Sequence, residues 1–222
     1  MLQGSVSAPV DTALLEWDQT TVVLAGAWNN AILSPAWVQR FVFQEQATQV
    51  LVSLHSAIGQ LTFEGTDATL RPELGRLVFT ARKKEREVLG ALETLSTRVL
   101  SKLPETPLRA VGANFAFSVA EADRVSALLE QLPLPAEWPR GDQQISHAWA
   151  IPRTEDGAQT TINVRVETTQ EVGSAFRVHF NFNTNVTRPE AAIGLIANRL
   201  GARLDDAKSI CGVLGLAAHE PE

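Results

Sequence analysis

The sequence predicts an α+β fold in which a mainly antiparallel sheet carries amphipathic helices packed on one face. Several segments alternate apolar and polar residues with a period of two, which is typical of strands with one buried face. Other stretches repeat apolar residues at three- and four-residue steps, which is typical of amphipathic helices. Three apolar strands also run into a polar, asparagine-bearing end just before a predicted helix, at residues 22–30, 111–117 and 176–183.

The first elements are a strand at residues 20–28 and a short helix after it. Ser34 can cap that helix, and Pro35 suits its first position, where no backbone N–H is needed. Residues 48–56 and 60–64 then alternate apolar and polar side chains between turn residues. An antiparallel meander is therefore predicted to follow the short helix.

A long helix is predicted over residues 83–103, because apolar residues recur there at helical spacing over some six turns. Pro104 ends it, since proline cannot continue a helix. A strand at residues 109–119 follows. Ser118 and Glu121 then have the spacing of a capping box, which predicts a further helix.

Two later strands, at residues 160–168 and 176–184, each place apolar side chains on one face and predict a hairpin. A slip of one residue would invert one of these faces, so two registers fit best. One of them sets Arg165 opposite Arg177, a repulsive pair that lowers stability. We predict the other, which sets these residues opposite one another: Glu167 and Arg177, Arg165 and His179, Asn163 and Asn181.

The last helix is predicted to open with a capping box formed by Thr187 and Glu190. Its buried stripe is predicted to contain Ile193, Ile196, Leu200 and Leu204.

A proline-rich connection at residues 133–141 divides the chain, because three prolines and a glycine forbid a continuous helix or a central strand. We predict an N-terminal α+β part at residues 1–132. A C-terminal hairpin-plus-helix part at residues 142–222 is predicted to pack against it, since it could hardly bury a core alone. A loose internal duplication is a further expectation, because residues 77–103 and 176–204 both run from strand to long helix.

Composition excludes several classes of function. The net charge of -6 argues against a general nucleic-acid binder, because such proteins neutralise phosphates with lysine and arginine. The basic cluster at residues 82–86 is interpreted as a solvated helix face, with nucleic-acid binding as its alternative. The single cysteine, Cys211, is expected to be a buried, inert thiol, and the four scattered histidines form no metal motif. No cofactor, metal site or catalytic residue is assigned.

The location of the protein is inferred from what the sequence lacks. No stretch reaches the ~20 apolar residues that a membrane-spanning helix needs. The first ten residues contain neither the basic nor the apolar region of a secretory signal. We therefore expect a cytoplasmic protein without a membrane partner.

The polar side of the last strand is the candidate binding surface. A solvent-facing side of an antiparallel sheet would explain it and is the favoured reading, but strands disfavour asparagine. The functional reading is a surface that hydrogen-bonds a polar ligand or a partner's backbone, formed by Arg177, His179, Asn181 and Asn183 with Asn163 and Arg165. Asn114 and the pair Asn29 and Asn30 suggest that asparagines from several strand ends converge on one pocket, although local backbone bonding is the favoured explanation for them.

Two segments, residues 28–37 and 103–115, resemble segments of uncharacterised bacterial proteins of similar length. The patterns are W-N-x-A-I-L-S-P-x-W and L-P-x-T-P-x-x-A-x-G-x-N-F. The resemblance implies a bacterial or mobile-element origin, and it implies no activity, cofactor or site.

The leading hypothesis is a non-catalytic interaction or scaffold protein that self-associates, using a sheet face or edge and exposed tryptophans. It is motivated by abundant strand edges and the absence of a chemical motif. The alternative is a small-molecule-binding protein or enzyme with a polar site around His179, Asn181 and Arg177.

Overall fold

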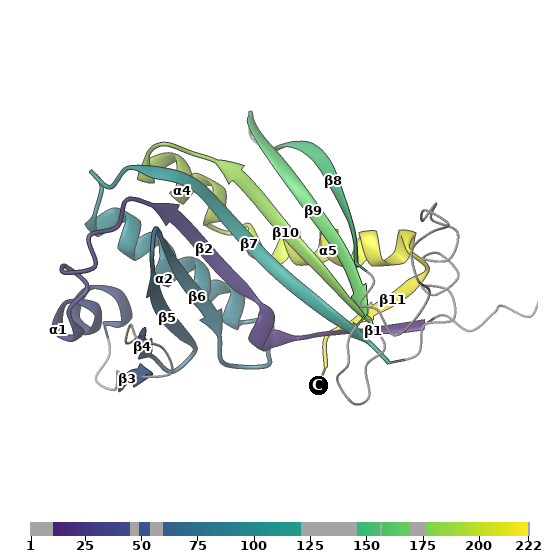
Figure 1. Ribbon diagram of the computed structural model, residues 1–222, viewed down its shortest axis with the longest axis horizontal. Helices are drawn as coiled ribbons and strands as arrows, with labels where there is room; N and C mark the ends of the chain where they lie inside the picture. Colours follow the sequence, from purple (N-terminus) through teal and green to yellow (C-terminus); the bar gives the residue numbers. More distant parts are fainter. Residues whose placement is uncertain are drawn as a thin grey trace, which may run out of the picture.

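A computed structural model describes residues 11–44, 49–53, 60–120, 146–155, 157–168 and 176–221, with the backbone alone for residues 49–53 and 60. Strands form one large sheet, and three helices lie behind it in the view of Figure 1. The predicted α+β class is therefore confirmed. The proline-rich connection at residues 133–141 and the helix predicted after Ser118 lie outside the described residues.

The sheet runs in the order β3-β4-β5-β6-β2-β7-β10-β9-β8, and every neighbouring pair in this path is antiparallel. Strand β1 pairs with β7 antiparallel and with β11 in parallel. The strands are β1 (Asp11–Leu15), β2 (Thr21–Gly26), β3 (Gln49–Ser53), β4 (Gln60–Glu64), β5 (Ala68–Glu73), β6 (Arg76–Ala81), β7 (Leu108–Val119), β8 (Ser146–Glu155), β9 (Ala158–Thr168), β10 (Phe176–Asn185) and β11 (Leu216–His219).

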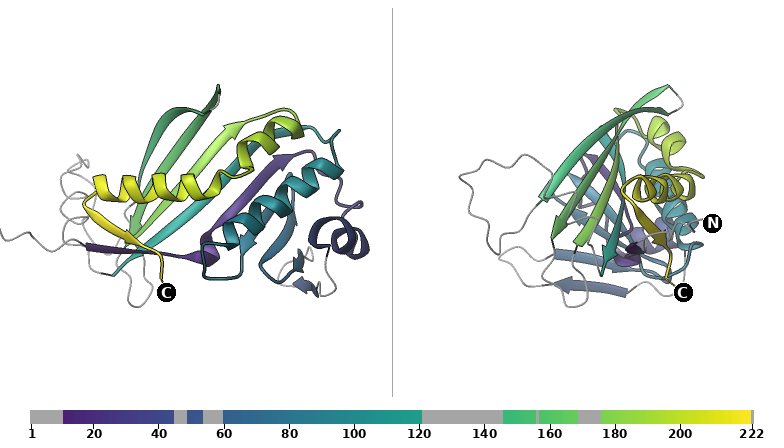
Figure 2. Two further views of the ribbon diagram at one scale, coloured as in Figure 1. Left: turned by 180° about the vertical axis from the view of Figure 1, so that it is seen from behind. Right: turned by 90° about the vertical axis from the view of Figure 1, so that its right-hand side faces the viewer.

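The described helices begin with a short 3-10 turn, η1 (Trp17–Gln19), and with α1 (Pro35–Val38), which continues as the π turn η2 (Gln39–Phe43). Three longer helices follow: α2 (Val88–Lys102), α4 (Pro189–Ile196) and α5 (Leu200–Val213). Seen from behind, these three cross the strands on one side of the sheet (Figure 2, left). We call this side the helix face, and the side turned toward the viewer in Figure 1 the front face.

The core lies between the sheet and these helices. From Val111 to Val119 on β7 and from Phe176 to Phe182 on β10, every second side chain is apolar and buried, and phenylalanines pack edge to face across the two strands. Phe115 meets Phe182 with ring centroids 6.0 Å apart, and Phe117 meets Phe180 at 5.8 Å. Since β7 and β10 come from opposite sides of the predicted boundary, the two parts share one sheet and one buried cluster.

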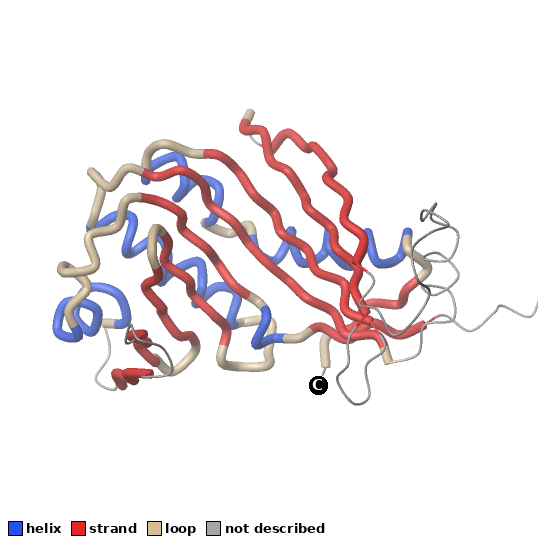
Figure 3. The backbone as a smooth tube through the Cα atoms, in the orientation of Figure 1, coloured by secondary structure: helices blue, strands red, loops and turns tan. Residues whose placement is uncertain are grey.

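The predicted hairpin register is confirmed. Arg177 lies opposite Glu167, His179 opposite Arg165, and Asn181 opposite Asn163. Strands β7, β10 and β9 lie side by side across the middle of Figure 3. The predicted cap of the first helix is also confirmed, because the N–H of Trp37 donates to Ser34 Oγ at 3.4 Å.

Helix α2 is shorter than predicted: it begins at Val88 and not at residue 83. Residues 83–87 form turns, and their cations point to acidic partners elsewhere. The helix dipole disfavours positive charge in a first turn, so a start after these cations avoids that penalty.

The last predicted helix is two helices. The chain breaks between α4 and α5 at Asn198, whose φ of 58° is left-handed. The capping box did not form either, since Arg188 is the N-cap of α4 and makes no side-chain cap bond. Ile196, Leu200 and Leu204 are buried as predicted, whereas Ile193 is half-buried.

Candidate interaction surface

The predicted binding residues gather on the front face of the sheet. Because β10 alternates, Val178, Phe180 and Phe182 enter the core and the residues between them project forward. The structure brings Arg177, His179, Asn181 and Asn183 of β10 together with Asn163, Arg165 and Glu167 of β9. We call these seven residues the polar face.

Three asparagines and a threonine form a hydrogen-bonded chain across four neighbouring strands. Asn163 Nδ2 donates to Asn181 Oδ1 at 3.0 Å, and Asn181 Nδ2 donates to Asn114 Oδ1 at 2.6 Å. Asn114 Nδ2 then donates to Thr21 Oγ1 at 2.8 Å. This amide chain runs at right angles to β9, β10, β7 and β2, with each residue directly opposite the next.

Small residues on β7 make room for the amides. Gly112 lies opposite Asn183, and a Cβ atom added to it would come within 3.4 Å of Asn181 Nδ2 and 4.0 Å of Asn183 Oδ1. Ala116 lies opposite His179 in the same way. Larger side chains at these positions would displace the polar face.

Two ion-paired groups lie on one side of the amide chain. His179 Nε2 lies 2.7 Å from Glu167 Oε1, and Arg165 Nε lies 3.3 Å from the other oxygen of Glu167. Arg177 holds Glu16, with 2.7 Å between Nε and Oε2 and 3.1 Å between Nη2 and Oε1.

Burial lowers the pKa of His179, and the positive charges of Arg165 and Arg177 act in the same direction. The hydrogen bond to Glu167 opposes this shift without cancelling it. The imidazole is therefore neutral near pH 7, and since a carboxylate can only accept, the tautomer that fits this bond carries its proton on Nε2.

The sequence did not predict that Glu16 and Thr21 bond to residues of the polar face and the amide chain, or that Asn114 belongs to the amide chain. Asn114 was interpreted as satisfying its local backbone, and that was wrong, because its side chain joins two other strands. For Asn29 the local account is confirmed, since its Oδ1 accepts from the N–H of Ala31 at 3.1 Å. Glu16 gave no signal, because it lies 161 residues from Arg177.

The basic cluster at residues 82–86 is largely neutralised within the molecule. Arg82 Nη2 lies 3.3 Å from Glu64 Oε2, and Lys83 Nζ lies 2.6 Å from Asp67 Oδ1. Its last arginine joins a network around α5. These cations therefore bind their own chain, and they do not form a helix face.

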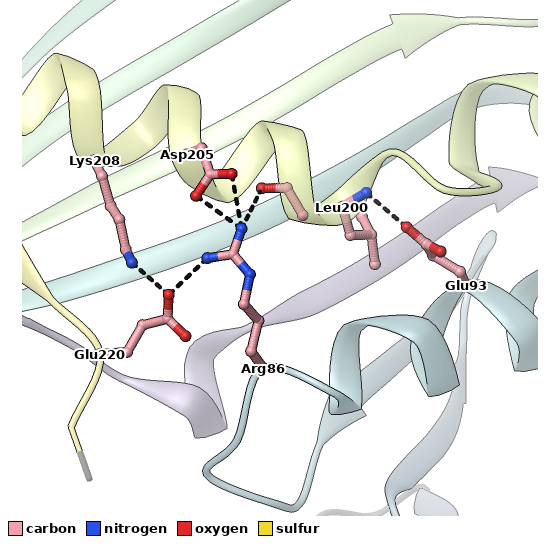
Figure 4. Close-up of polar contacts among 7 residues, drawn as sticks. Arg86, Glu93, Leu200, Asp205, Lys208 and Glu220 are labelled. Atoms are coloured by element: carbon pink, nitrogen blue, oxygen red, sulfur yellow. Dashed lines mark hydrogen bonds and ion pairs between the residues drawn. The ribbon is translucent and has the colours of Figure 1, made fainter.

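A second network, drawn in Figure 4, ties α5 and the chain after β11 to the start of α2. Arg86 reaches Asp205 at 2.7 Å and Glu220 at 2.8 Å, and Lys208 pairs with the same glutamate. Glu93 of α2 accepts from the N–H groups of Asn198 and Leu200 at 3.0 and 2.7 Å. We call Arg86, Glu93, Asp205, Lys208 and Glu220 the clasp.

A small cavity lies apart from the polar face. It measures about 210 Å³ and is lined by Phe43, Thr66, Asp67, Gly90, Ala91, Thr94, Leu95 and Arg98, beside α2 and the turn before β5. Polar-face residues are not among its lining.

The remaining features are the metal-binding residue types, the cysteine and the helices of the described part of the chain. Its His, Cys, Asp and Glu residues include no group of three that could hold a metal ion. Cys211 is buried, and burial raises the pKa of its thiol to about 12, as an inert cysteine requires. Among the described helices, none combines the length and apolar character needed to cross a membrane.

Comparison with known proteins assigns no family to the chain. Neither a protein-family model nor a curated protein matches the sequence. The resemblance to bacterial proteins therefore stays a prediction, and the geometry of the polar face carries the functional argument.

Proposed function

We propose that this is a non-catalytic interaction protein of the cytoplasm, which self-associates and docks a partner protein on the polar face. The observation that carries the proposal is the pairing of polar side chains on the front face: the amide chain joins four strands, and beside it Glu167 holds His179 and Glu16 holds Arg177. The lone cysteine leaves the fold without an internal disulfide, which suits a reducing compartment.

Prior pairing favours contact with a protein. Covering a polar group that lacks a partner costs about 1–3 kcal/mol, whereas a paired group can lose its water at a smaller cost. Side-chain exposure is low for three members of the polar face, at 19% for Arg177, 25% for His179 and 15% for Glu167, whereas Asn163 and Arg165 are exposed. A partner that lies over the first three meets groups that are already fixed and partly shielded from water, and ordering them costs little further entropy.

The small-molecule or enzyme alternative has one observation in its favour, the short contact between His179 and Glu167. Such a pair resembles a base and its orienting carboxylate. The cavity beside α2, however, contains no polar-face residue, and the side-chain amide of Asn181 already bonds to Asn163 and Asn114. Docking of a protein surface uses this arrangement better than enclosure of a small ligand.

Tryptophans contribute less than the sequence suggested. Trp17 is buried, and Trp28, Trp37 and Trp149 are half-buried. The expectation of an exposed tryptophan is therefore wrong for Trp17, while the other three keep part of their rings at the surface and pack over the core.

Multi-angle light scattering tests self-association, with a mass of about twice the 24.1 kDa of one chain expected. A single-chain mass at every concentration would refute that half of the proposal.

Differential capture tests the polar face. Wild-type protein and Asn181→Arg are each used as bait in a lysate of the source organism, with Asn185→Arg, an exposed residue at the end of β10, as the matched control. We expect a protein that wild type and control retain and Asn181→Arg loses at equal folding. An identical set of captured proteins for all three baits would overturn the docking role.

A further inference from the structure

The edge strand β8 has unusual properties for the end of a sheet. Within the described residues it pairs with β9 alone, over ten consecutive residues without a register shift. The opposite edge, β3, is only five residues long. Long regular edges are templates for pairing with another chain, and proteins commonly shorten, bend or charge them.

The hairpin geometry fixes which backbone groups of β8 face outward. Glu155 lies opposite Ala158 across a two-residue connection, so these two form a hydrogen-bonded pair. Gly157, with φ of 81°, suits the left-handed position of such a turn. Bonding to β9 then alternates, so odd-numbered residues of β8 bond β9 and even-numbered residues direct their N–H and C=O outward.

Pro152 agrees with this assignment independently. A proline has no N–H to donate, so it is tolerated in a strand only where that group would face away from the neighbouring strand. Position 152 is even-numbered and faces outward. The free edge therefore keeps the N–H groups of Ser146, Ala148, Ala150 and Thr154, and the carbonyls of all five even positions.

Apart from Pro152, which removes one outward N–H, the side chains do not protect this edge. Residues 146–152 carry no carboxylate, lysine or arginine, and Ile151 is 39% exposed. The charges of β8 lie at its hairpin end, where α5 holds them: Arg153 pairs with Asp206 at 2.5 Å and Glu155 with the buried Arg203 at 3.0 Å. These pairs anchor β8 and leave the edge uncharged.

We propose that β8 pairs antiparallel with β8 of a second copy, about a two-fold axis at Ala150. This inference rests on the proposed self-association and assigns it a site. Two antiparallel copies present the same edge to each other, which is the condition for a closed dimer. The overlap from residue 146 to residue 154 forms about eight backbone hydrogen bonds, and Pro152 accepts from Ala148 of the other copy without needing to donate.

The side chains fit this register on both faces. On the helix face, Trp149 lies opposite Ile151 of the partner subunit, an aromatic and β-branched pair that stabilises neighbouring strands. On the front face, only the methyl groups of Ala150 meet at the axis. Since Ala150 lies opposite Asn163, the two amide chains extend outward from the axis in both copies.

The first test places charge at the axis. Ala150 is exposed in one copy, so Ala150→Lys leaves the core unchanged and sets two ammonium groups face to face in the dimer. We expect the dissociation constant to rise about 100-fold, because like charges repel at short range. Leu74→Lys, in the fully exposed turn between β5 and β6, is the matched control and should dimerise like wild type.

A charge swap separates a lost interface from a misfolded variant. Ala150→Lys and Ala150→Glu should each be monomeric, and an equimolar mixture should recover the dimer, because opposite charges then meet at the axis. Failure of the mixture to dimerise, with both variants folded by circular dichroism, would overturn the assignment.

A disulfide at Ala150→Cys tests the register. Opposed residues of a hydrogen-bonded pair have Cα atoms about 5.5 Å apart, within the range that a disulfide spans. Oxidation should link two chains, whereas Leu74→Cys should not. If the wild type is a dimer, but Ala150→Lys dimerises equally well and Ala150→Cys forms no disulfide link, then self-association stands and the β8 edge is refuted as its site. If the wild type is a monomer, self-association is refuted as well.

Discussion

The polar face and the clasp are both networks of side chains from distant parts of the sequence, but they stand on different supports. The amide chain joins β9, β10, β7 and β2, which the backbone hydrogen bonds of the sheet already hold in place. The clasp joins the turn before α2, helix α5 and the chain after β11, and its side chains supply contacts between them that the sheet does not (Figure 4).

This difference separates groups that the fold needs from groups that it can spare. Side chains that connect loosely held segments are explained by that connection. Side chains that bond across an existing sheet add little to its assembly, so their pairing is available for recognition. The comparison predicts that substitutions in the clasp release structure, whereas substitutions in the polar face change a surface.

The largest effect is expected for Glu93→Ala. Glu93 caps α5 by accepting from two backbone N–H groups, and loss of such a cap costs about 1–2 kcal/mol of unfolding free energy. Urea unfolding measures it. Glu105→Ala, an exposed carboxylate in the turn after α2, should change stability by less than about 0.5 kcal/mol. Equal losses of unfolding free energy in the two variants would contradict a stabilising role of the clasp.

Asn181→Ala comes next, because it leaves amide groups of Asn163 and Asn114 without their partner. A loss of about 1 kcal/mol is expected, with Asn185→Ala close to wild type. A double-mutant cycle with Asn163→Ala should show a coupling of about 0.5 kcal/mol or more. Additive losses would mean that the amide chain is not a unit.

Arg86→Ala should act locally. Arg86 and its partner Asp205 are largely exposed, so global stability should fall by less than about 1 kcal/mol. Hydrogen exchange in Leu216–His219 should nevertheless accelerate about tenfold, because the contact of Glu220 with the turn before α2 is lost. Lys84→Ala, an exposed neighbour, is the control. An unchanged rate of hydrogen exchange in β11 would show that the contact between Arg86 and Glu220 does not stabilise this strand.

The smallest effect is a pH dependence at His179. Burial lowers its folded-state pKa below the ordinary 6.5, so as pH falls below that value the unfolded chain takes up the proton first. Its contribution to stability is therefore complete above pH 6.5 and is lost as pH falls through the folded-state pKa. Glu167, Arg165 and Arg177 face the ring and set this balance.

His179→Gln should flatten stability between pH 7.5 and 5.5 in urea titrations, and His147→Gln should retain the slope. If the unfolding free energy of the wild type rises as the pH falls, the pKa of His179 is raised on folding and not lowered.

The sequence was sufficient to predict the register of two strands that are neighbours in the chain. Face parity and the repulsion between Arg165 and Arg177 were sufficient for the β9–β10 register, because both strands lie in one hairpin. The positions of β7 and β2 against β10 depend on the closure of the whole sheet, which local patterns do not contain. For this reason Asn114 and Glu16 could not be placed.

The predictions of an α2 that begins at residue 83 and of a single last helix were wrong for a related reason. Periodicity over residues 83–103 is helical, but the partners of Arg86 and the N–H groups that Glu93 caps are more than 100 residues away. Tertiary contacts therefore decided where both helices begin. The internal duplication is untested and stays a prediction.

The pairing of β1 with β11 bears on how the protein is made. Asp11 lies opposite Leu216 in a parallel pair, while the other edge of β1 bonds β7. The ribosome must synthesise every residue between β1 and β11 before this pair can form, so one edge of β1 waits unpaired over that interval. Closure of this corner is thus a late, long-range folding step, at which a chaperone or a second nascent chain has the longest opportunity to bind.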